Sequence, residues 1–356
     1  MSPLSELLTL PGSGVFTVHT GQEKKNFLLK EYYGTTDETE AKKIWAKKSL
    51  KLKNDLPHLF GIPSDNGGGI QRGANWGPLI LREELLKRDV KFRDLGDVRV
   101  IPHLLHDKYL NQETINDCQK ALYGKKNKLP VSPLSMAEEA LKLIYHKSPE
   151  IKIFGMGGDH STSYPLVKTW FESRSQPKKS ALIHFDAHTD LLDKRLGIDL
   201  CFGTWTYHII KDLGLKNQVY QLGIRSTGKT KAHWEKTCGV KQIWAKQMNQ
   251  LGPQRVTETL VSQLKKNKVQ EIYISFDIDA LDIAYASATG TPEAQGINPF
   301  DAAYIIQALS EEFFVTGADL MELAPFVLPN GVRESSQKSS IDVAADISSC
   351  LIRALS

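Results

Sequence analysis

Acidic and histidine residues recur at three places in the chain, each directly after a short apolar run. The runs IKIFGM, ALIHF and EIYISF end where these groups begin. The three groups are Gly157-Gly158-Asp159-His160, Asp186-Ala187-His188-Thr189-Asp190 and Asp277-Ile278-Asp279-Ala280-Leu281-Asp282. Imidazoles and carboxylates in this combination are the ligand set of a site for two divalent metals. Two metals that share carboxylates can generate a hydroxide nucleophile at neutral pH.

The spacing within the groups suggests how their side chains converge. Asp186, His188 and Asp190 alternate, so we expect them to point the same way if the strand geometry continues beyond the apolar run. The same holds for Asp277 and Asp279. Two such edges side by side would surround a pair of ions, with a bridging carboxylate from each. A mostly oxygen shell with one imidazole per ion favours Mn²⁺, with Ni²⁺ or Co²⁺ as alternatives, whereas Zn²⁺ more often takes Cys or several His.

Each group taken alone has a common alternative explanation. A DxHxD sequence is often a solvated loop, and Asp159 or Ser161 can simply cap a following helix. The group beginning at Asp277 resembles a turn or a weak calcium loop. Because all three groups follow strand-like runs in one chain, we interpret them together as a binuclear metal site.

From His58 onward, strand-like runs alternate with helix-like runs. The strand-like runs are LPHLFGIP, VKFRDL, IKIFGM, SALIHF, VYQLGI, EIYISF and VTGADLMEL. The helix-like runs are SMAEEALKLIYHK, PLVKTWFESR, GTWTYHIIKDLG, ETLVSQLKKN, PFDAAYIIQALSEEF and IDVAADISSCLIRAL. This alternation predicts an α/β fold with a mostly parallel sheet and helices on both faces. Functional residues of such sheets gather beyond the carboxyl ends of the strands, where all three groups lie.

The first part of the chain differs from the rest in its pattern. It has a short apolar stretch at residues 15–18 and a charged, helix-like piece from about Thr36 to Lys53, with an N-terminal helix signal at residues 36–38. We therefore expect an N-terminal extension, residues 1–57, packed on a main domain of residues 58–356.

The composition restricts the class of protein. With 356 residues, 41% hydrophobic and 24% charged, the chain is typical of a soluble globular protein. Its net charge of +4 is small and no basic cluster is interleaved with aromatic residues, so we expect no nucleic-acid partner. Four widely spaced cysteines, a poor signal sequence and no apolar run of about 18 residues predict a cytoplasmic protein without a membrane partner.

Further motifs give the chain a clear resemblance to the ureohydrolase family, which includes arginases, agmatinases, guanidinobutyrases and formiminoglutamases. It covers roughly residues 58–356 and includes the segments GIPSDNGGGIQRGANWGP, FRDLGDV, QLGIR and TGTP. The resemblance implies a three-layer α/β/α domain and a homo-oligomer, usually a trimer or hexamer. It also implies hydrolysis of an amidine-type C–N bond, with urea and an amine as products.

The resemblance also implies roles for individual residues. One ion would be held by His160, Asp186, Asp190 and Asp277, and the other by Asp186, His188, Asp277 and Asp279, with Asp186 and Asp277 bridging both. Asp190 stands where the family hydrogen-bonds the bridging hydroxide and moves its proton. Glu322 matches the glutamate that binds the guanidinium, a planar cation with several N–H donors. Its alternative role is a strand-end glutamate that faces solvent.

Four positions depart from the family pattern or leave two roles open. Phe202 stands where the family usually has a histidine, so we expect it to form an apolar wall or a cation–π face of the substrate pocket and not to transfer protons. His208, on the following helix, either replaces that imidazole or packs the helix. Leu192 stands where arginases carry an asparagine for an α-amino acid, which disfavours L-arginine. His184 is either an orienter of a ligand or, as we expect, a strand histidine in the core.

These observations favour a binuclear metal-dependent hydrolase of a small guanidino or amidine substrate. Agmatine, a guanidino acid or guanidine is favoured over L-arginine. Three alternatives remain: a formimino hydrolase that releases formamide, a deacetylase-like amidohydrolase with a single zinc, and a non-catalytic binding protein with the same fold. Phe202 motivates the last of these.

Overall fold

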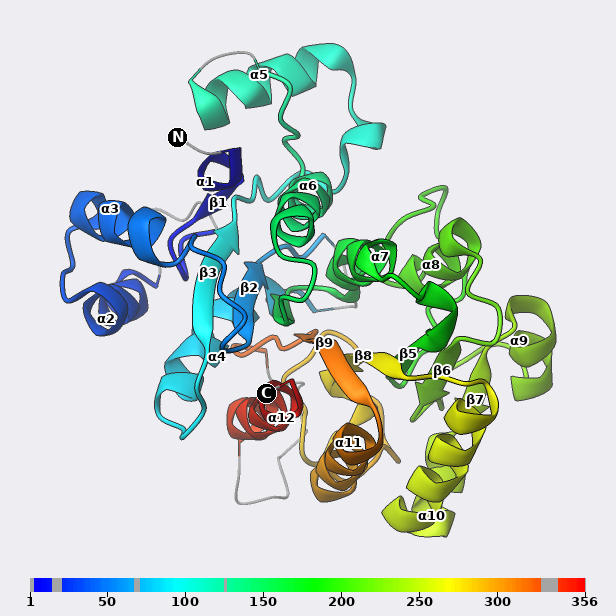
Figure 1. Ribbon diagram of the computed structural model, residues 1–356. Helices are drawn as coiled ribbons and strands as arrows, with labels where there is room; N and C mark the ends of the chain where they lie inside the picture. Colours follow the sequence, from blue (N-terminus) through cyan, green and yellow to red (C-terminus); the bar gives the residue numbers. More distant parts are fainter. Residues whose placement is uncertain (1–2, 15–20, 67–70, 125–126, 328–338, 356) are drawn as a thin grey trace.

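A computed structural model of the chain describes residues 3–14, 21–66, 71–124, 127–327 and 339–355 (Figure 1). The described residues form one nine-stranded sheet in the order β1-β3-β2-β4-β9-β8-β5-β6-β7. Every strand pairing is parallel except that of β1 with β3. The strands are β1 Leu8–Thr9, β2 His58–Ile62, β3 Arg93–Val98, β4 Ile153–Gly157, β5 Ser180–Phe185, β6 Val219–Leu222, β7 Lys241–Ile243, β8 Glu271–Asp277 and β9 Phe314–Met321. The predicted mostly parallel sheet is confirmed.

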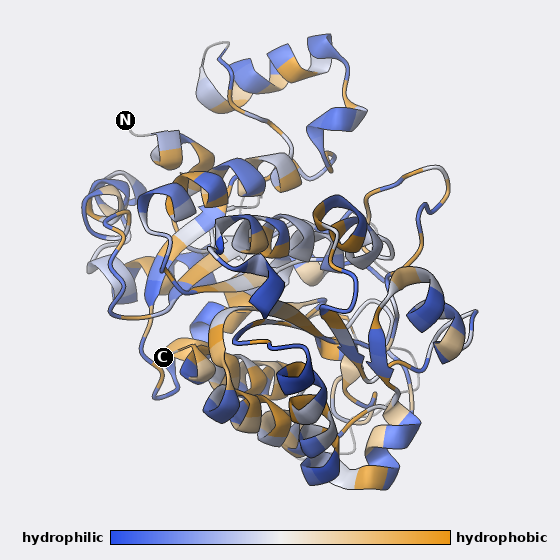
Figure 2. Cartoon of the chain, turned by 45° about the vertical axis from the view of Figure 1, so that its right-hand side comes forward, coloured by the Kyte–Doolittle hydropathy of each residue, from blue (hydrophilic) through white to orange (hydrophobic). Residues whose placement is uncertain are grey.

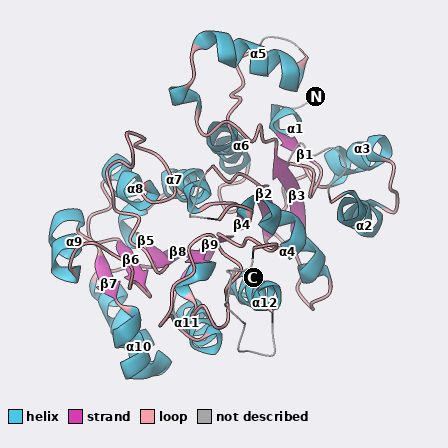
Figure 3. Ribbon diagram, turned by 180° about the vertical axis from the view of Figure 1, so that it is seen from behind, coloured by secondary structure: helices cyan, strands magenta, loops and turns pink. Residues whose placement is uncertain are grey.

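Helices cover both faces of the sheet (Figures 1 and 3). On one face α6, α7 and α8 pack in sequence, and on the other α4, α12, α11 and α10 form a second row. The α-helices are α1 Pro3–Leu7, α2 Gln22–Tyr33, α3 Glu38–Lys48, α4 Gly77–Leu86, α5 Gln112–Tyr123, α6 Pro133–Lys147, α7 Ser163–Ser173, α8 Trp205–Leu213, α9 Lys231–Cys238, α10 Ala245–Lys266, α11 Pro299–Glu312 and α12 Ser340–Ala354. The arrangement is the predicted three-layer α/β/α fold.

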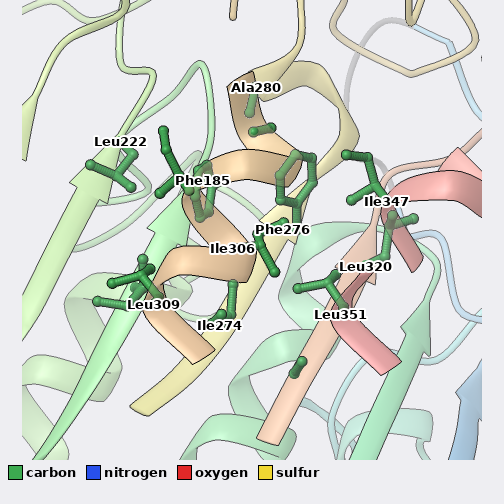
Figure 4. Close-up of a cluster of buried hydrophobic side chains, with 14 of the residues drawn as sticks. Phe185, Leu222, Ile274, Phe276, Ala280, Ile306, Leu309, Leu320, Ile347 and Leu351 are labelled. Atoms are coloured by element: carbon green, nitrogen blue, oxygen red, sulfur yellow. The ribbon is translucent and has the colours of Figure 1, made fainter. Parts of the chain in front are cut away.

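Each face of the sheet carries its own hydrophobic core. Alternate residues of a strand point to opposite faces, so Ile183 and Phe185 of β5 join one cluster while Leu182 joins the other. Figure 4 shows the first cluster, in which Phe185 and Phe276 of the strands pack against α11 and α12. Figure 2 shows the apolar positions concentrated at the sheet and on the helix surfaces that cover it. A strand buried on both faces reads as a continuous apolar run, which is why these runs were recognisable in the sequence.

The N-terminal residues add to the edge of this sheet. β1 extends the sheet beside β3, α1 lies against α6, and α2 lies against α4 and α3. The predicted charged helix is α3, which begins as expected, because the Asp37 side chain accepts a hydrogen bond from the Glu40 N–H. Residues 15–18, which we expected to form a short apolar stretch, lie outside the described residues. The boundary between an extension of residues 1–57 and a domain of residues 58–356 stays a prediction.

The short strands and several helices were not expected from the sequence. β1 and β7 have two and three residues, too few for a periodic pattern. α10 starts well before the predicted run and includes a kink at Gly252, directly before Pro253. Within the part of the chain that the structure describes, no helix is both long and apolar enough to span a membrane.

Candidate metal centre and active site

The predicted site residues meet at the carboxyl ends of the central strands. His160 lies in a 3₁₀ turn after β4, the group beginning at Asp186 follows β5, and Glu322 follows β9. Asp277 is the last residue of β8, and Asp279 lies in the next 3₁₀ turn. Beside these strand ends is a cavity of about 440 Å³. Its lining includes His160, Asp186, His188, Asp190, Asp277, Phe202 and Glu322.

His160 is the centre of the first group of potential ligands. Its Nδ1 atom lies 3.0 Å from Oδ2 of Asp277, 3.1 Å from Oδ2 of Asp186 and 3.5 Å from Oδ2 of Asp190. Its Nε2 atom lies 3.1 Å from the hydroxyl of Ser275, which in turn donates to Asp319. The far side of the ring is therefore fixed, and Nδ1 faces three carboxylates.

His188 is the centre of the second group. Its Nδ1 atom lies 3.0 Å from Oδ2 of Asp279 and 3.4 Å from Oδ1 of Asp186. The Asp186 carboxylate thus contributes one oxygen to each group. Asp279 is held from two further sides, since it accepts the Ala187 N–H at 3.0 Å and the Thr291 hydroxyl at 3.1 Å.

The backbone that carries these residues does not continue the extended geometry of the strands. β5 ends at Phe185, and Asp190 has a left-handed φ of 52°. Asp277 caps the 3₁₀ turn that carries Asp279, whose N–H donates to Oδ1 of Asp277 at 2.8 Å. The condition of a continued strand is therefore not met, because capping carboxylates turn the chain at the ends of β5 and β8. Convergence results from these turns and not from strand alternation.

Glu322 is buried beside the first group. Its side chain is only 3% exposed, and its Oε1 accepts the backbone N–H of His160 at 2.9 Å. Its backbone has a left-handed φ of 63°, a conformation that non-glycine residues adopt mainly where the surroundings require it. The alternative of a solvent-facing glutamate does not describe this position.

Of the two other predicted pocket residues, Phe202 lies at the cavity and His208 lies away from it. Phe202 lines the cavity, and the guanidinium of Arg195 lies 4.5 Å from its ring centre. The cation that we expected on this ring is therefore supplied by the protein itself. His208 does not line the cavity, and its Nε2 lies 3.0 Å from the Asp193 carbonyl oxygen. This placement favours a packing role for His208 over replacement of the missing imidazole.

His184 is a fully buried histidine of β5, as expected, and it also contacts the site. Its Nε2 atom lies 2.8 Å from Oδ2 of Asp186, and its Nδ1 lies 3.0 Å from the Gln221 amide. The alternation of His184 with Asp186 was the signal for this role. Asp159 takes the capping alternative, because its Oδ1 accepts the Ser161 N–H. Asp282 likewise binds backbone N–H groups of its own loop.

The sequence did not reveal several supporting residues. Trp205 donates its indole N–H to Oδ2 of Asp190 at 2.8 Å, and its ring centre lies 4.8 Å from that of His160. Ser275 stands two residues before Asp277, so the alternation of side chains along the strand was a signal that would have identified it. Asp319 lies on β9 beside Ser275, a contact between distant segments that no local pattern predicts. These partners fix the orientation of the potential ligands, as is common around metal sites.

The pKa values of the acidic and histidine residues in the site are shifted far from their ordinary values. Burial and the neighbouring carboxylates raise the pKa of Asp190, Asp277 and Glu322 well above the ordinary range. Burial also raises the pKa of Asp186, but the three neighbouring histidines, His160, His184 and His188, outweigh it and hold that pKa well below its usual value. Burial lowers the pKa of His160, yet its carboxylate neighbours raise it overall. Such a concentration of like charge is costly unless cations neutralise it.

The residues present fit a pair of divalent cations. His160, His184, Asp186 and Asp190 have ligand atoms within 4.8 Å of one another, as do Asp186, His188 and Asp279. His160 Nδ1 makes no hydrogen bond of proper geometry within the described residues, although it is buried and faces three carboxylates. A buried imidazole nitrogen without a hydrogen bond is the arrangement that a metal ligand requires.

A family model described as the arginase family matches residues 57–352. The chain belongs to the arginase family. As a member of it, the chain is an enzyme, a hydrolase of C–N bonds, and the resemblance read from its motifs is confirmed.

Relatives with assigned activities match most of the chain. A human mitochondrial guanidino acid hydrolase is 31% identical over 287 residues, 75% of this chain and 71% of the relative. An agmatinase from Bacillus anthracis is 29% identical over 295 residues, 81% of this chain and 90% of the relative.

Solved structures support the fold. The formimidoylglutamase of Bacillus subtilis superposes with a TM-score of 0.65 at 19% identity, over 84% of this chain and 86% of the other. The proclavaminate amidino hydrolase of Streptomyces clavuligerus gives a TM-score of 0.63 at 21% identity, over 86% and 98% respectively.

Proposed function

We propose that this enzyme hydrolyses a small guanidino compound to urea and an amine with the help of two divalent metal ions. The observation that carries the proposal is the position of Glu322. This buried carboxylate lies in the same cavity as the His and Asp groups and is joined to His160 by a hydrogen bond. One cavity therefore offers a site for metals and an anion for a guanidinium.

We propose as metal ligands the residues that both histidines face. His160, Asp186, Asp190 and Asp277 would hold one ion, and Asp186, His188, Asp277 and Asp279 the other. Mn²⁺ suits these oxygen-rich sets, with Ni²⁺ or Co²⁺ as the next candidates. When bound, such ions supply charge stabilisation and lower the pKa of a water molecule.

The protein side chains position the substrate and manage its protons. One oxygen of Glu322 is occupied by the His160 N–H, which leaves the other to accept a guanidinium N–H. Trp205 fixes one oxygen of Asp190, and burial raises the pKa of that carboxyl, so its carboxylate form is a stronger base than that of an ordinary aspartate. Asp190 is thus suited to take a proton from the attacking water and pass it to the leaving amine. The water oxygen ends in urea, and the C–N bond to the amine breaks.

Leu192 supports a substrate other than L-arginine. Its apolar side chain lines the cavity just after Asp190, where arginases carry an asparagine for an α-amino acid. An apolar side chain gives no hydrogen bond to an α-carboxylate or an α-ammonium group.

Urea release from a panel of guanidino compounds tests the proposal. The protein is loaded separately with Mn²⁺, Ni²⁺ and Co²⁺, and each preparation is given agmatine, 4-guanidinobutyrate, 3-guanidinopropionate, guanidine and L-arginine. We expect urea from at least one compound other than L-arginine. If no compound yields urea but a formimino substrate yields formamide, the reaction assigned here is wrong while the metal site stands. The metal content per chain separates both outcomes from a single-zinc amidohydrolase.

Three further properties stay predictions. The metal of the cell is expected to be Mn²⁺, the location cytoplasmic, and the assembly a trimer or hexamer. Metal analysis of protein purified from its own cells, cell fractionation and sedimentation equilibrium test them in turn.

A further inference from the structure

A tight hairpin forms part of the wall of the active-site cavity. Between Asp190 and α8 the chain makes a loop that turns at residues 195–198. The N–H of Arg195 donates to the Ile198 carbonyl at 2.8 Å, and the N–H of Ile198 donates to the Arg195 carbonyl at 2.9 Å. Leu196 and Gly197 both have left-handed φ, 50° and 87°. Two consecutive left-handed residues are the signature of a type I′ turn, which matches the twist of the strands it joins.

Contacts on both sides hold this loop in place. His208 on α8 meets the Asp193 carbonyl before the turn. After the turn, Lys108 pairs with Asp199 at 2.9 Å, and the Tyr109 hydroxyl accepts the N–H of Leu200 at 2.9 Å. The hairpin therefore presents Arg195 from a fixed backbone, which reduces the entropy that a ligand must overcome to use this side chain.

Arg195 faces the cavity from the Phe202 ring. The centre of its guanidinium lies 4.5 Å from the ring centre, and both residues line the cavity. The contact with the ring holds the guanidinium at the cavity, and its N–H donors make no hydrogen bond within the described residues. In the part of the chain that the structure describes, no carboxylate forms an ion pair with it.

The cavity is divided by charge. The metal-site carboxylates and Glu322 gather where the strands end. The remaining lining is uncharged, with Leu192, Phe202, Thr227 and Trp234 among its members, apart from Arg195. Arg195 is the only lysine or arginine that lines the described cavity. A substrate with its guanidino group at the acidic end therefore meets one fixed cation with the rest of its length.

We propose that Arg195, whose guanidinium lies over the Phe202 ring, binds a carboxylate at the end of the substrate remote from the guanidino group, so that the substrates are guanidino carboxylic acids. This inference rests on the proposed function. A planar guanidinium pairs with a carboxylate through two parallel N–H···O bonds. Agmatine carries an ammonium group at the same end, which Arg195 repels. Guanidine has no distal group and leaves Arg195 unused.

The proposal is tested by comparing how the metal-loaded enzyme binds and hydrolyses ligands that differ only at the end remote from the guanidino group. Titration calorimetry compares 4-guanidinobutyrate with its methyl ester and with agmatine, and urea release is followed for the same compounds. The variant is Arg195→Gln. The matched control is Lys194→Gln, which removes a charge from the same hairpin at a residue that does not line the cavity. Arg195→Lys, which keeps the charge without the planar fork, is the third variant.

We expect 4-guanidinobutyrate to bind more tightly than its ester or agmatine. Arg195→Gln should weaken its binding by about tenfold or more, because the change removes charge-assisted hydrogen bonds to the carboxylate. Lys194→Gln should leave the affinity for 4-guanidinobutyrate unchanged, and Arg195→Lys should give an affinity between those of Arg195→Gln and the native enzyme. Agmatine should bind to Arg195→Gln as tightly as to the native enzyme, or more tightly.

The outcomes separate the two proposals. If agmatine is hydrolysed and the acid neither binds nor reacts, the proposed function stands and the role of Arg195 is wrong. If the acid binds through Arg195 but no compound yields urea, the reaction is wrong and the carboxylate site stands. Equal losses in Arg195→Gln and Lys194→Gln would overturn the site in favour of a general surface-charge effect.

Discussion

Two buried clusters of charged residues lie at different parts of the sheet, and they are balanced in different ways. Arg82 of α4 lies between two aspartates of β3, with its Nε 2.7 Å from Asp94 and its Nη1 2.6 Å from Asp97. Its remaining donors reach the carbonyl oxygens of Pro78 and Gly96. This cluster carries its own cation and is nearly complete as a structural unit.

The cluster at the strand ends carries no such cation. Four aspartates and Glu322 face two histidines there, and in the described part of the chain no lysine or arginine forms an ion pair with any of them. The carboxylates of this cluster are as deeply buried as those of the Arg82 cluster. Buried charge by itself therefore does not mark a functional site. What marks it is a deficit of positive charge that only a bound ion can fill.

The largest expected effect comes from removing a carboxylate from the incomplete cluster. Asp279→Ala should lower the metal content and reduce hydrolysis more than about a thousandfold, because metal-assisted hydrolysis depends on several kcal/mol of charge stabilisation. The fold should stay largely intact, as judged by circular dichroism. Metal analysis and urea release measure the effect, with the exposed Asp117→Ala as control. Full activity with normal metal content would refute the ligand assignment.

Removing the cation from the complete cluster should damage stability. Arg82→Ala leaves Asp94 and Asp97 buried without a partner, and the loss of one member of a buried pair costs about 3–5 kcal/mol. Urea denaturation measures this loss, and Lys87→Ala, at the exposed end of the same helix, should change stability by less than about 0.5 kcal/mol. A small loss of unfolding free energy in Arg82→Ala would contradict the view that the Arg82 cluster depends on its own cation.

His58 tests the case of a buried group with no partner. Its ring is fully buried, and neither nitrogen has a hydrogen-bond partner within the described residues. Burial lowers the pKa of His58 to about 4. The unfolded chain binds this proton below about pH 6.5 while the folded chain does not, so stability falls as the pH drops from 6.5 to 4. His58→Gln should remove about 2–3 kcal/mol of that acid sensitivity.

We compare the native protein with His58→Gln by measuring the denaturation midpoint of each at pH 7 and at pH 4.5. The exposed His146→Gln serves as the control for the loss of a histidine. Parallel pH profiles of the native protein and His58→Gln would contradict the burial argument.

The smallest expected effect concerns the wall of the cavity. Phe202→His should shift the relative rates among guanidino compounds by several-fold, because the ring that supports Arg195 becomes smaller and polar. The readout is the ratio of kcat/KM values for 4-guanidinobutyrate and agmatine. Unchanged ratios would remove Phe202 from substrate selection.

Much of the fold was predictable because the central strands are buried on both faces. Their apolar runs, the helices between them and the acidic groups at their ends all follow local patterns. The N-terminal edge was not predictable, since β1 is too short to have a period. The boundary at residue 57 stays a prediction.

The site was predictable in its members and less so in its geometry. The acidic and histidine residues stand out in type and spacing, whereas the turns after β5 and β8 depend on capping bonds that no periodicity reveals. Trp205 took its place through a contact between two segments, whereas His184 contacts Asp186 two residues along the same segment. Arg195 gave no signal, because its meaning depends on the ring beneath it.

The position of β9 has a consequence for the order in which the protein assembles. β9 is the last strand along the described chain, yet it occupies the centre of the sheet, between β4 and β8. A nascent chain that has emerged only to residue 313 lacks the strand that pairs with both β4 and β8, so His160 and the groups at Asp186 and Asp277 belong to sets of strands that are not yet joined. Insertion of β9 joins these sets and brings Glu322 to His160 in the same step. Catalytic competence thus arrives late in synthesis, and until then the open edges of β4 and β8 are the places where the chain is most exposed to mispairing.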